Sequence, residues 1–246
     1  AQAYQLRARA HIANGNFESS IVDLTEALRY RPDWAQAYLD RARARLSMGR
    51  DGAMADLDEA IRADAKNVDA YLERGAIRIG REDRLGALKD FNEALRIDDT
   101  CPEAYLGRAE ILTDYGDFDA AVEDYTRVLE NDGGSFELYR GRAQAFFELK
   151  LYRSAIADLA EALSLHPNSS DLLLQRGKAR RFLGEFDDAI EDFTHVIAIN
   201  PLSSEASAMR GLARNQNRDW DEAIADFDAA LVLDPYPIGP DIMVLA

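Results

Sequence analysis

Apolar residues along the chain recur every three or four positions, in segments of about a dozen residues that come in pairs. One pair covers residues 171–183 and 187–199, with Gly184 and Glu185 between the two segments. Segments of this length and spacing predict amphipathic helices rather than strands. Two such helices joined by a short turn predict an antiparallel helical hairpin.

The hairpin pattern repeats seven times along the chain. An Asp followed by a large apolar residue recurs at intervals of 34 residues, with a single interval of 33, and an Arg recurs with the same period. The short interval places a one-residue deletion near Met48 to Asp51, a glycine-flanked stretch that predicts a turn. The predicted repeats are 1–34, 35–67, 68–101, 102–135, 136–169, 170–203 and 204–237.

Small and large residues alternate at fixed places within each repeat. Ala or Gly stands at the eighth place of each first helix, as in Ala8 and Gly177, and a small residue recurs in each second helix. Bulky aromatic residues such as Tyr38 and Phe186 stand between these positions, and Pro follows four of the second helices. This alternation predicts helices that pack closely and interlock.

These places resemble the tetratricopeptide repeat family, and the resemblance covers residues 1–237. It implies an all-α fold, a right-handed superhelical solenoid of seven antiparallel helix-turn-helix repeats. Residues 238–246 are then a C-terminal extension or a truncated capping helix. The chain departs from the common pattern at the seventh place of each repeat, where Arg replaces Leu. It also departs at four places where Tyr is usual: Arg45, Arg78, Arg180 and Arg214.

The repeated Arg and the repeated Asp lie on opposite helices of each hairpin. Because they share one period, we expect a structural ladder of ion pairs, made within the repeat or with a neighbour. The alternative is a track of cations for an acidic ligand, but matched charges mostly neutralise each other, which favours the structural interpretation. The ladder residues are Arg7, Asp23, Arg41, Asp56, Arg74, Asp90, Arg108, Asp124, Arg142, Asp158, Arg176, Asp192, Arg210 and Asp226.

The resemblance also implies that first helices line a concave groove, through places two, five, nine, twelve and thirteen of each repeat. The implied partner-binding residues are Arg9, Leu39, Arg43, Leu46, Leu72, Ile79, Leu106, Arg140, Phe147, Leu174, Lys178 and Arg181. This mixture of leucines and cations suits an extended or helical peptide. The alternative is that the leucines pack between adjacent first helices. The Lys and Asn residues with which chaperone-binding members hold a terminal carboxylate are missing, since Gln5 and Arg9 occupy the first pair of places.

Composition limits the partners and the compartment. The chain of 246 residues has 29 basic and 45 acidic residues and a net charge of −16, which argues against binding to nucleic acid or to an anionic bilayer. No apolar run approaches the roughly 18 residues that suggest direct membrane insertion. The single cysteine, Cys101, excludes a disulfide within the chain. A cytoplasmic location is favoured, and a periplasmic or secreted one stays open.

The sequence offers no candidate for catalysis. His11, His166 and His195 are isolated and lack metal-ligand spacing, and Cys101 has no matching base. We therefore expect no enzyme activity, no cofactor and no metal.

These patterns predict a non-catalytic scaffold or adaptor that binds a protein or peptide segment in the groove. The chain opens at Ala1 in a helical pattern without an initiator Met, so we expect a segment of a longer protein. The alternative function is therefore the regulatory or substrate-recruiting segment of a larger enzyme, such as a transferase or kinase. A third interpretation is self-association through the apolar C-terminal end. The sequence encodes neither the identity of the partner nor the oligomeric state.

Overall fold

The computed structural model describes residues 1–132 and 134–234. Fourteen α-helices and no strand are found in these residues, which confirms the predicted all-α fold of paired helices. The helices are α1 (Gln2–Ala13), α2 (Phe17–Tyr30), α3 (Ala35–Ser47), α4 (Ala53–Ala63), α5 (Val68–Gly80), α6 (Arg84–Ile97), α7 (Pro102–Tyr115), α8 (Phe118–Asp132), α9 (Phe136–Glu148), α10 (Tyr152–Leu165), α11 (Ser170–Leu183), α12 (Phe186–Ile199), α13 (Ser204–Asn217) and α14 (Trp220–Leu233). The predicted C-terminal extension, 238–246, lies outside the described residues.

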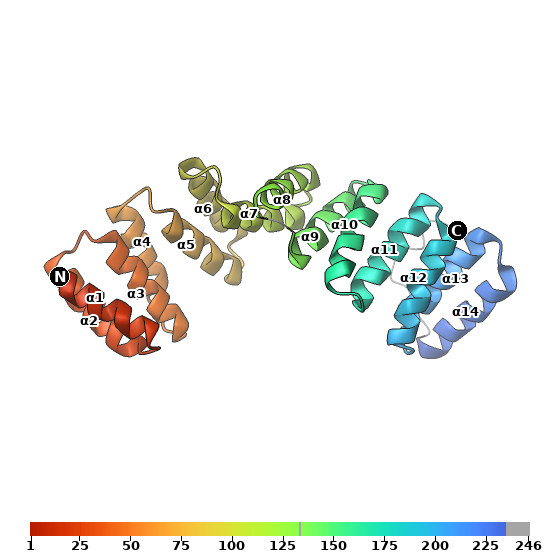
Figure 1. Cartoon of the computed structure of the whole chain (residues 1–246), viewed down its shortest axis with the longest axis horizontal. Helices are drawn as coiled ribbons and strands as arrows, with labels where there is room; N and C mark the ends of the chain where they lie inside the picture. Colours follow the sequence, from red (N-terminus) through yellow and green to blue (C-terminus); the bar gives the residue numbers. More distant parts are fainter. Residues whose placement is uncertain (133, 235–246) are drawn as a thin grey trace. The chain divides into compact units, whose positions relative to one another are not determined.

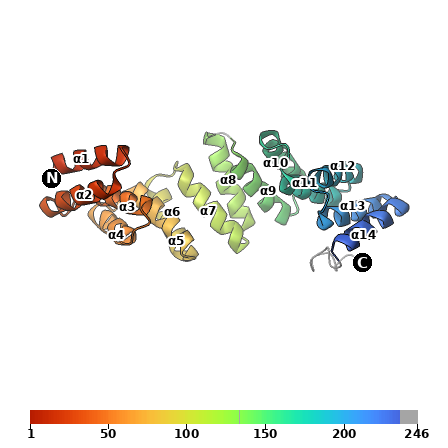
Figure 2. The same cartoon turned by 90° about the horizontal axis from the view of Figure 1, so that it is seen from below.

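The chain divides into two compact units, Ala1–Ile111 and Leu112–Ala246. Within each unit, helices that follow one another in the sequence pack side by side (Figures 1 and 2). First helices of adjacent repeats also touch, as α1 touches α3 and α11 touches α13. The helices therefore alternate along the chain between odd-numbered first helices and even-numbered second helices, in roughly seven pairs.

The turns inside the hairpins depend on residues in the left-handed region. Gly184, between α11 and α12, has φ +86°, and Gly15 has φ +73° in the first hairpin. The shortened second repeat turns through Gly49 and Gly52, with φ of +61° and +94°. The residue that the sequence pattern shows to be missing therefore falls in the turn between α3 and α4.

The residues that face each other across the two helices of a hairpin are matched in size, with a small residue opposite a large one. Where the second helix carries Phe after the ladder Asp, the facing residue of the first helix is Gly: a Cβ on Gly177 would lie 2.6 Å from Phe193 Cε1. Gly75 faces Phe91 and Gly211 faces Phe227 in the same way. Where the second helix carries Leu, the facing residue is Ala, as in Ala8 with Leu24, Ala42 with Leu57 and Ala143 with Leu159. Pairing small with large residues keeps the helix separation similar from one hairpin to the next.

No helix among the described residues combines the length and the apolar character needed to cross a membrane.

Candidate functional site

The ladder residues form bidentate ion pairs inside the hairpins. In the hairpin of α11 and α12, Arg176 Nε lies 3.0 Å from Asp192 Oδ2, and Nη2 lies 2.6 Å from Oδ1. The same arrangement joins Arg7 with Asp23, Arg41 with Asp56, Arg74 with Asp90, Arg142 with Asp158 and Arg210 with Asp226. Arg108 and Asp124 belong to different units, and their pairing stays a prediction.

A second arginine reaches four of these carboxylates from one turn further along the first helix. Arg180 Nη1 donates to Asp192 Oδ2 at 2.7 Å. The same 2.7 Å contact joins Arg45 with Asp56, Arg78 with Asp90 and Arg214 with Asp226. These four arginines stand where the tetratricopeptide pattern has Tyr, and the sequence analysis gave them no role. Their spacing of four residues from the ladder Arg was the available signal, because residues i and i+4 share one face of a helix.

The ladder arginines also tie adjacent repeats together. Arg74 Nη1 donates to Asp58 on the preceding second helix at 2.8 Å. Burial lowers the pKa of Arg74, but hydrogen bonds from it to Asp90 and Asp58 outweigh this effect, so the pKa is raised. Threonines take the place of Asp58 in other repeats, where Arg41 donates to Thr25, Arg142 to Thr126 and Arg210 to Thr194.

The ladder carboxylates are at most 5% exposed, and the guanidinium groups that face them are already engaged. These contacts support a structural role for the ladder and leave it poorly suited to follow an acidic ligand.

The implied groove residues do not share one environment. Leu39 is 1% exposed and packs in the core with Ala42 and Leu57, so its assignment to a partner-binding surface is corrected to a core role. The same place in a repeat can face a neighbouring helix, which was the alternative left open for the leucines. Leu174 is partly buried between two core clusters. Leu46, in contrast, is 39% exposed.

Arg181 is also buried, at 6% exposure, and is therefore unavailable as a surface cation. Its Nη1 donates to Gln216 at 3.0 Å, its guanidinium lies over the ring of Phe182, and its Nε has no hydrogen-bond partner. Burial lowers its pKa. Near it, Phe147 packs edge-on against Phe182 and Tyr152. Arg140 is exposed and stacks on Phe136.

Cations at the ninth place of a repeat bridge to the next first helix. Arg9 donates to Asp40 at 3.1 Å, and Lys178 donates to Glu205 at 2.7 Å. Arg43 contacts both Glu73 and Asp69, at 2.9 and 3.0 Å. Burial lowers the pKa of Arg43, but its hydrogen bonds to these two carboxylates outweigh that effect, so the pKa is raised. These three cations, which were predicted to meet a partner, are therefore already paired between repeats.

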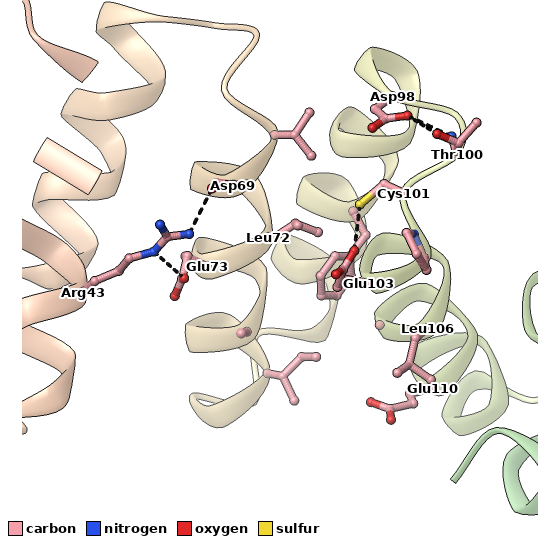
Figure 3. A pocket seen from close by; sticks show the side chains of 16 residues that line it. Arg43, Asp69, Leu72, Glu73, Asp98, Thr100, Cys101, Glu103, Leu106 and Glu110 are labelled. Atoms are coloured by element: carbon pink, nitrogen blue, oxygen red, sulfur yellow. Dashed lines mark hydrogen bonds and ion pairs between the residues drawn. The ribbon is translucent and has the colours of Figure 1, made fainter. Parts of the chain in front are cut away.

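A cavity of about 770 Å³ lies between α5 and α7, the first helices of the third and fourth repeats (Figure 3). Its apolar lining includes Leu72 and Ile79 from α5 and Leu106 from α7, with Phe91 of α6 contributing as well. Leu72 and Leu106 project from opposite sides of the gap in Figure 3. Three apolar residues of the implied groove thus meet around one cavity.

Carboxylates dominate the polar lining of this cavity. Five of them line it together with one guanidinium, Arg43; the five are Asp69, Glu73, Asp98, Glu103 and Glu110. Thr100 donates to Asp98 through its hydroxyl and its backbone N–H, and these bonds lower the pKa of Asp98. The groove residues predicted from sequence include five cations, whereas the polar lining of this cavity is mainly acidic.

Cys101 lies at the edge of the cavity, where it is 6% exposed. Burial raises the pKa of its thiol, so the neutral form is favoured and a nucleophilic role has no support. Groups of three or more His, Cys, Asp or Glu that could hold a metal ion are not found in the described part of the chain.

Antiparallel helix pairs stacked in sequence order define the class of α-helical repeat proteins. The tetratricopeptide repeat family matches residues 6–67, 106–170 and 174–237, and the chain belongs to this family. Tetratricopeptide repeats are typically scaffolds of protein–protein interaction and are generally non-catalytic.

Solved structures share the fold. YrrB, described as a TPR protein with an unusual peptide-binding site, is 19% identical with a TM-score of 0.69, over 76% of this chain and 94% of its own. The C-terminal part of a TPR protein from Cytophaga hutchinsonii is 19% identical with a TM-score of 0.70, over 93% and 95% of the two chains. MamA is 26% identical with a TM-score of 0.65, over 70% and 94%. No curated protein matches the chain.

Proposed function

We propose that the chain is a non-catalytic scaffold that binds a peptide or a protein segment in the groove lined by its first helices. The observation that carries this proposal is the cavity between α5 and α7. About 770 Å³ of open space with an apolar lining can accept the side chains of a short segment. The peptide-binding site named for YrrB, which shares the fold, is consistent with this use of the repeats.

A selection from an unbiased library of displayed random peptides tests this proposal. We expect peptides to be enriched on the wild-type chain and to lose binding to the Leu106→Arg variant, because the longer side chain fills the cavity. The matched control is Leu85→Arg, on the outer helix α6, where Leu85 is 64% exposed. The control should bind as the wild type does, and circular dichroism should show equal helix content in all three proteins. Enrichment that is unaffected by Leu106→Arg would place the binding site elsewhere.

A further inference from the structure

Two bridges between adjacent first helices share one register, in which the ninth residue of a repeat reaches the second residue of the next repeat: Lys178 contacts Glu205, and Arg43 contacts Asp69. Ninth-place cations also reach the sixth residue of the next repeat, as Arg9 reaches Asp40 and Arg43 reaches Glu73. In both cases the cation lies between the two first helices and neutralises a carboxylate on the second of them. A side chain of this length also fills space that the two helices would otherwise leave open.

The third repeat breaks this register. Its ninth residue is Ala76, and the receiving carboxylate on α7 is Glu103. Both residues line the cavity, and Glu103 is exposed. Among the described residues, no Lys or Arg lies within ion-pair distance of Glu103; its contact is a weak one from the Cys101 thiol, at 3.5 Å (Figure 3).

The neighbouring first helices α9 and α11 also combine a ninth residue that is not a cation with a cavity between repeats. There the ninth residue is Gln144, which donates to Glu148 in its own helix instead of crossing to α11. A smaller cavity of about 230 Å³ is lined by Gln144 and Phe147. The cations that line the two cavities are both already paired: Lys178 is bound to Glu205, and Arg43 is bound to Asp69 and Glu73.

We infer that the segment bound between α5 and α7 carries a Lys or Arg that pairs with Glu103, in the place that Arg43 and Lys178 occupy in their own repeats. An apolar side chain next to that cation packs against Leu72, Ile79 and Leu106. The partner is thus a cationic and apolar protein segment, and an acidic segment is repelled by the five carboxylates of the lining. This inference rests on the proposed function and specifies its ligand.

The peptide selection tests the inference through the composition of the enriched sequences. We expect Lys or Arg beside an apolar residue to be enriched over the starting library. Representative peptides, labelled with fluorescein, are then measured by fluorescence anisotropy at low and high salt. Replacing the Lys or Arg by Ser should raise the dissociation constant about tenfold at low salt, since a hydrogen bond to a charged group is lost. The difference should shrink as salt screens the pair.

Two variants locate the contact. Glu103→Gln should remove most of the preference for the cationic peptide over its Ser counterpart. Ala76→Arg should form an internal bridge to Glu103. It should lower the affinity for the cationic peptide at least as much as Glu103→Gln does, without lowering the melting temperature. The matched control is Glu205→Gln, because Glu205 holds the same register position but is already paired with Lys178. This control should keep the preference.

The outcomes separate the inference from the proposed function. Enriched peptides that are neutral or acidic and that lose binding with Leu106→Arg would overturn the inference and keep the groove as the binding site. A preference for cationic peptides that survives Glu103→Gln would also overturn the inference. A selection that enriches no peptide would overturn both.

Discussion

A single carboxylate of a second helix binds two arginines of the first helix in four of the hairpins. Asp192 is 2% exposed and accepts hydrogen bonds from both Arg176 and Arg180. A buried carboxylate with two guanidinium partners exchanges the hydration of three charged groups for direct contacts, so its net stabilisation is small. Removing one member, however, strands the others.

Replacing Asp192 by Asn should therefore lower the free energy of unfolding by about 3 kcal/mol, because two partly buried guanidinium groups lose their counter-charge. Urea unfolding followed by circular dichroism measures the change. The control is Glu191→Gln, an exposed neighbour on the same helix, which should change stability by less than about 0.5 kcal/mol. Equal effects of the two substitutions would show that the ladder contributes nothing beyond surface charge.

The ladder can be predicted from the sequence because Arg and Asp recur with the same period on the two helices of each hairpin. Such a match of opposite charges indicates ion pairs. The second arginines, such as Arg180, were noticed only as departures from the family pattern. Their contacts depend on the side-chain conformation that lets two arginines, one turn apart, reach the same carboxylate, and periodicity does not specify this conformation. Leu39 was misplaced because a periodic place fixes a helix face but does not fix whether that face meets a neighbour or open space.

At the scale of helices, the Gly and Phe pairs set how closely the hairpin packs. A Cβ on Gly177 would lie 2.6 Å from Phe193 Cε1, and Phe193 is fully buried and has little room to move. Overpacking costs about 1–3 kcal/mol, whereas Ala gains at most about 1 kcal/mol over Gly in helix propensity. The clash therefore outweighs the propensity.

We expect Gly177→Ala to lower the free energy of unfolding by about 1 kcal/mol. The control is Gly80→Ala at the end of α5, where a Cβ meets nothing within 4 Å; it should be neutral or stabilising. Adding Phe193→Leu to Gly177→Ala recreates the Ala and Leu pair of other hairpins and should cost less than the two single changes combined. Additive losses in urea unfolding would argue against direct coupling between the two positions.

The sequence predicted the helices closely: residues 171–183 and 187–199 were expected, and α11 and α12 cover Ser170–Leu183 and Phe186–Ile199. It did not predict which step between first helices would be open. At the cavity the ninth place of the repeat holds Ala76, whereas Arg43 and Lys178 hold the same place elsewhere and bridge to the next first helix. Such a difference becomes visible only when the register between neighbouring repeats is known.

At the scale of the whole chain, stability is spread over contacts between neighbours in sequence. Within each of the two units, a hairpin packs on the next one, so each hairpin contributes its own increment to the stability of its unit. The first hairpin joins the second through core contacts of Ala8, Leu24 and Ala37 and through the bonds of Gln5 and Arg9 to Asp40.

Removing the first hairpin, to leave residues 35–246, should lower the unfolding midpoint but preserve the helix content per residue, because the remaining repeats keep their neighbours. Circular dichroism at 222 nm and urea titration measure both quantities. A shortened chain that has lost most of its helix content would show long-range dependence that a row of nearest-neighbour contacts does not produce.

If the cavity between α5 and α7 receives a segment of another protein, a crystal structure of the chain with a selected peptide will show it. We expect an apolar side chain of the peptide against Leu72, Ile79 and Leu106, with a Lys or Arg within hydrogen-bond distance of Glu103. A peptide bound along the second helices, with this cavity empty, would contradict it.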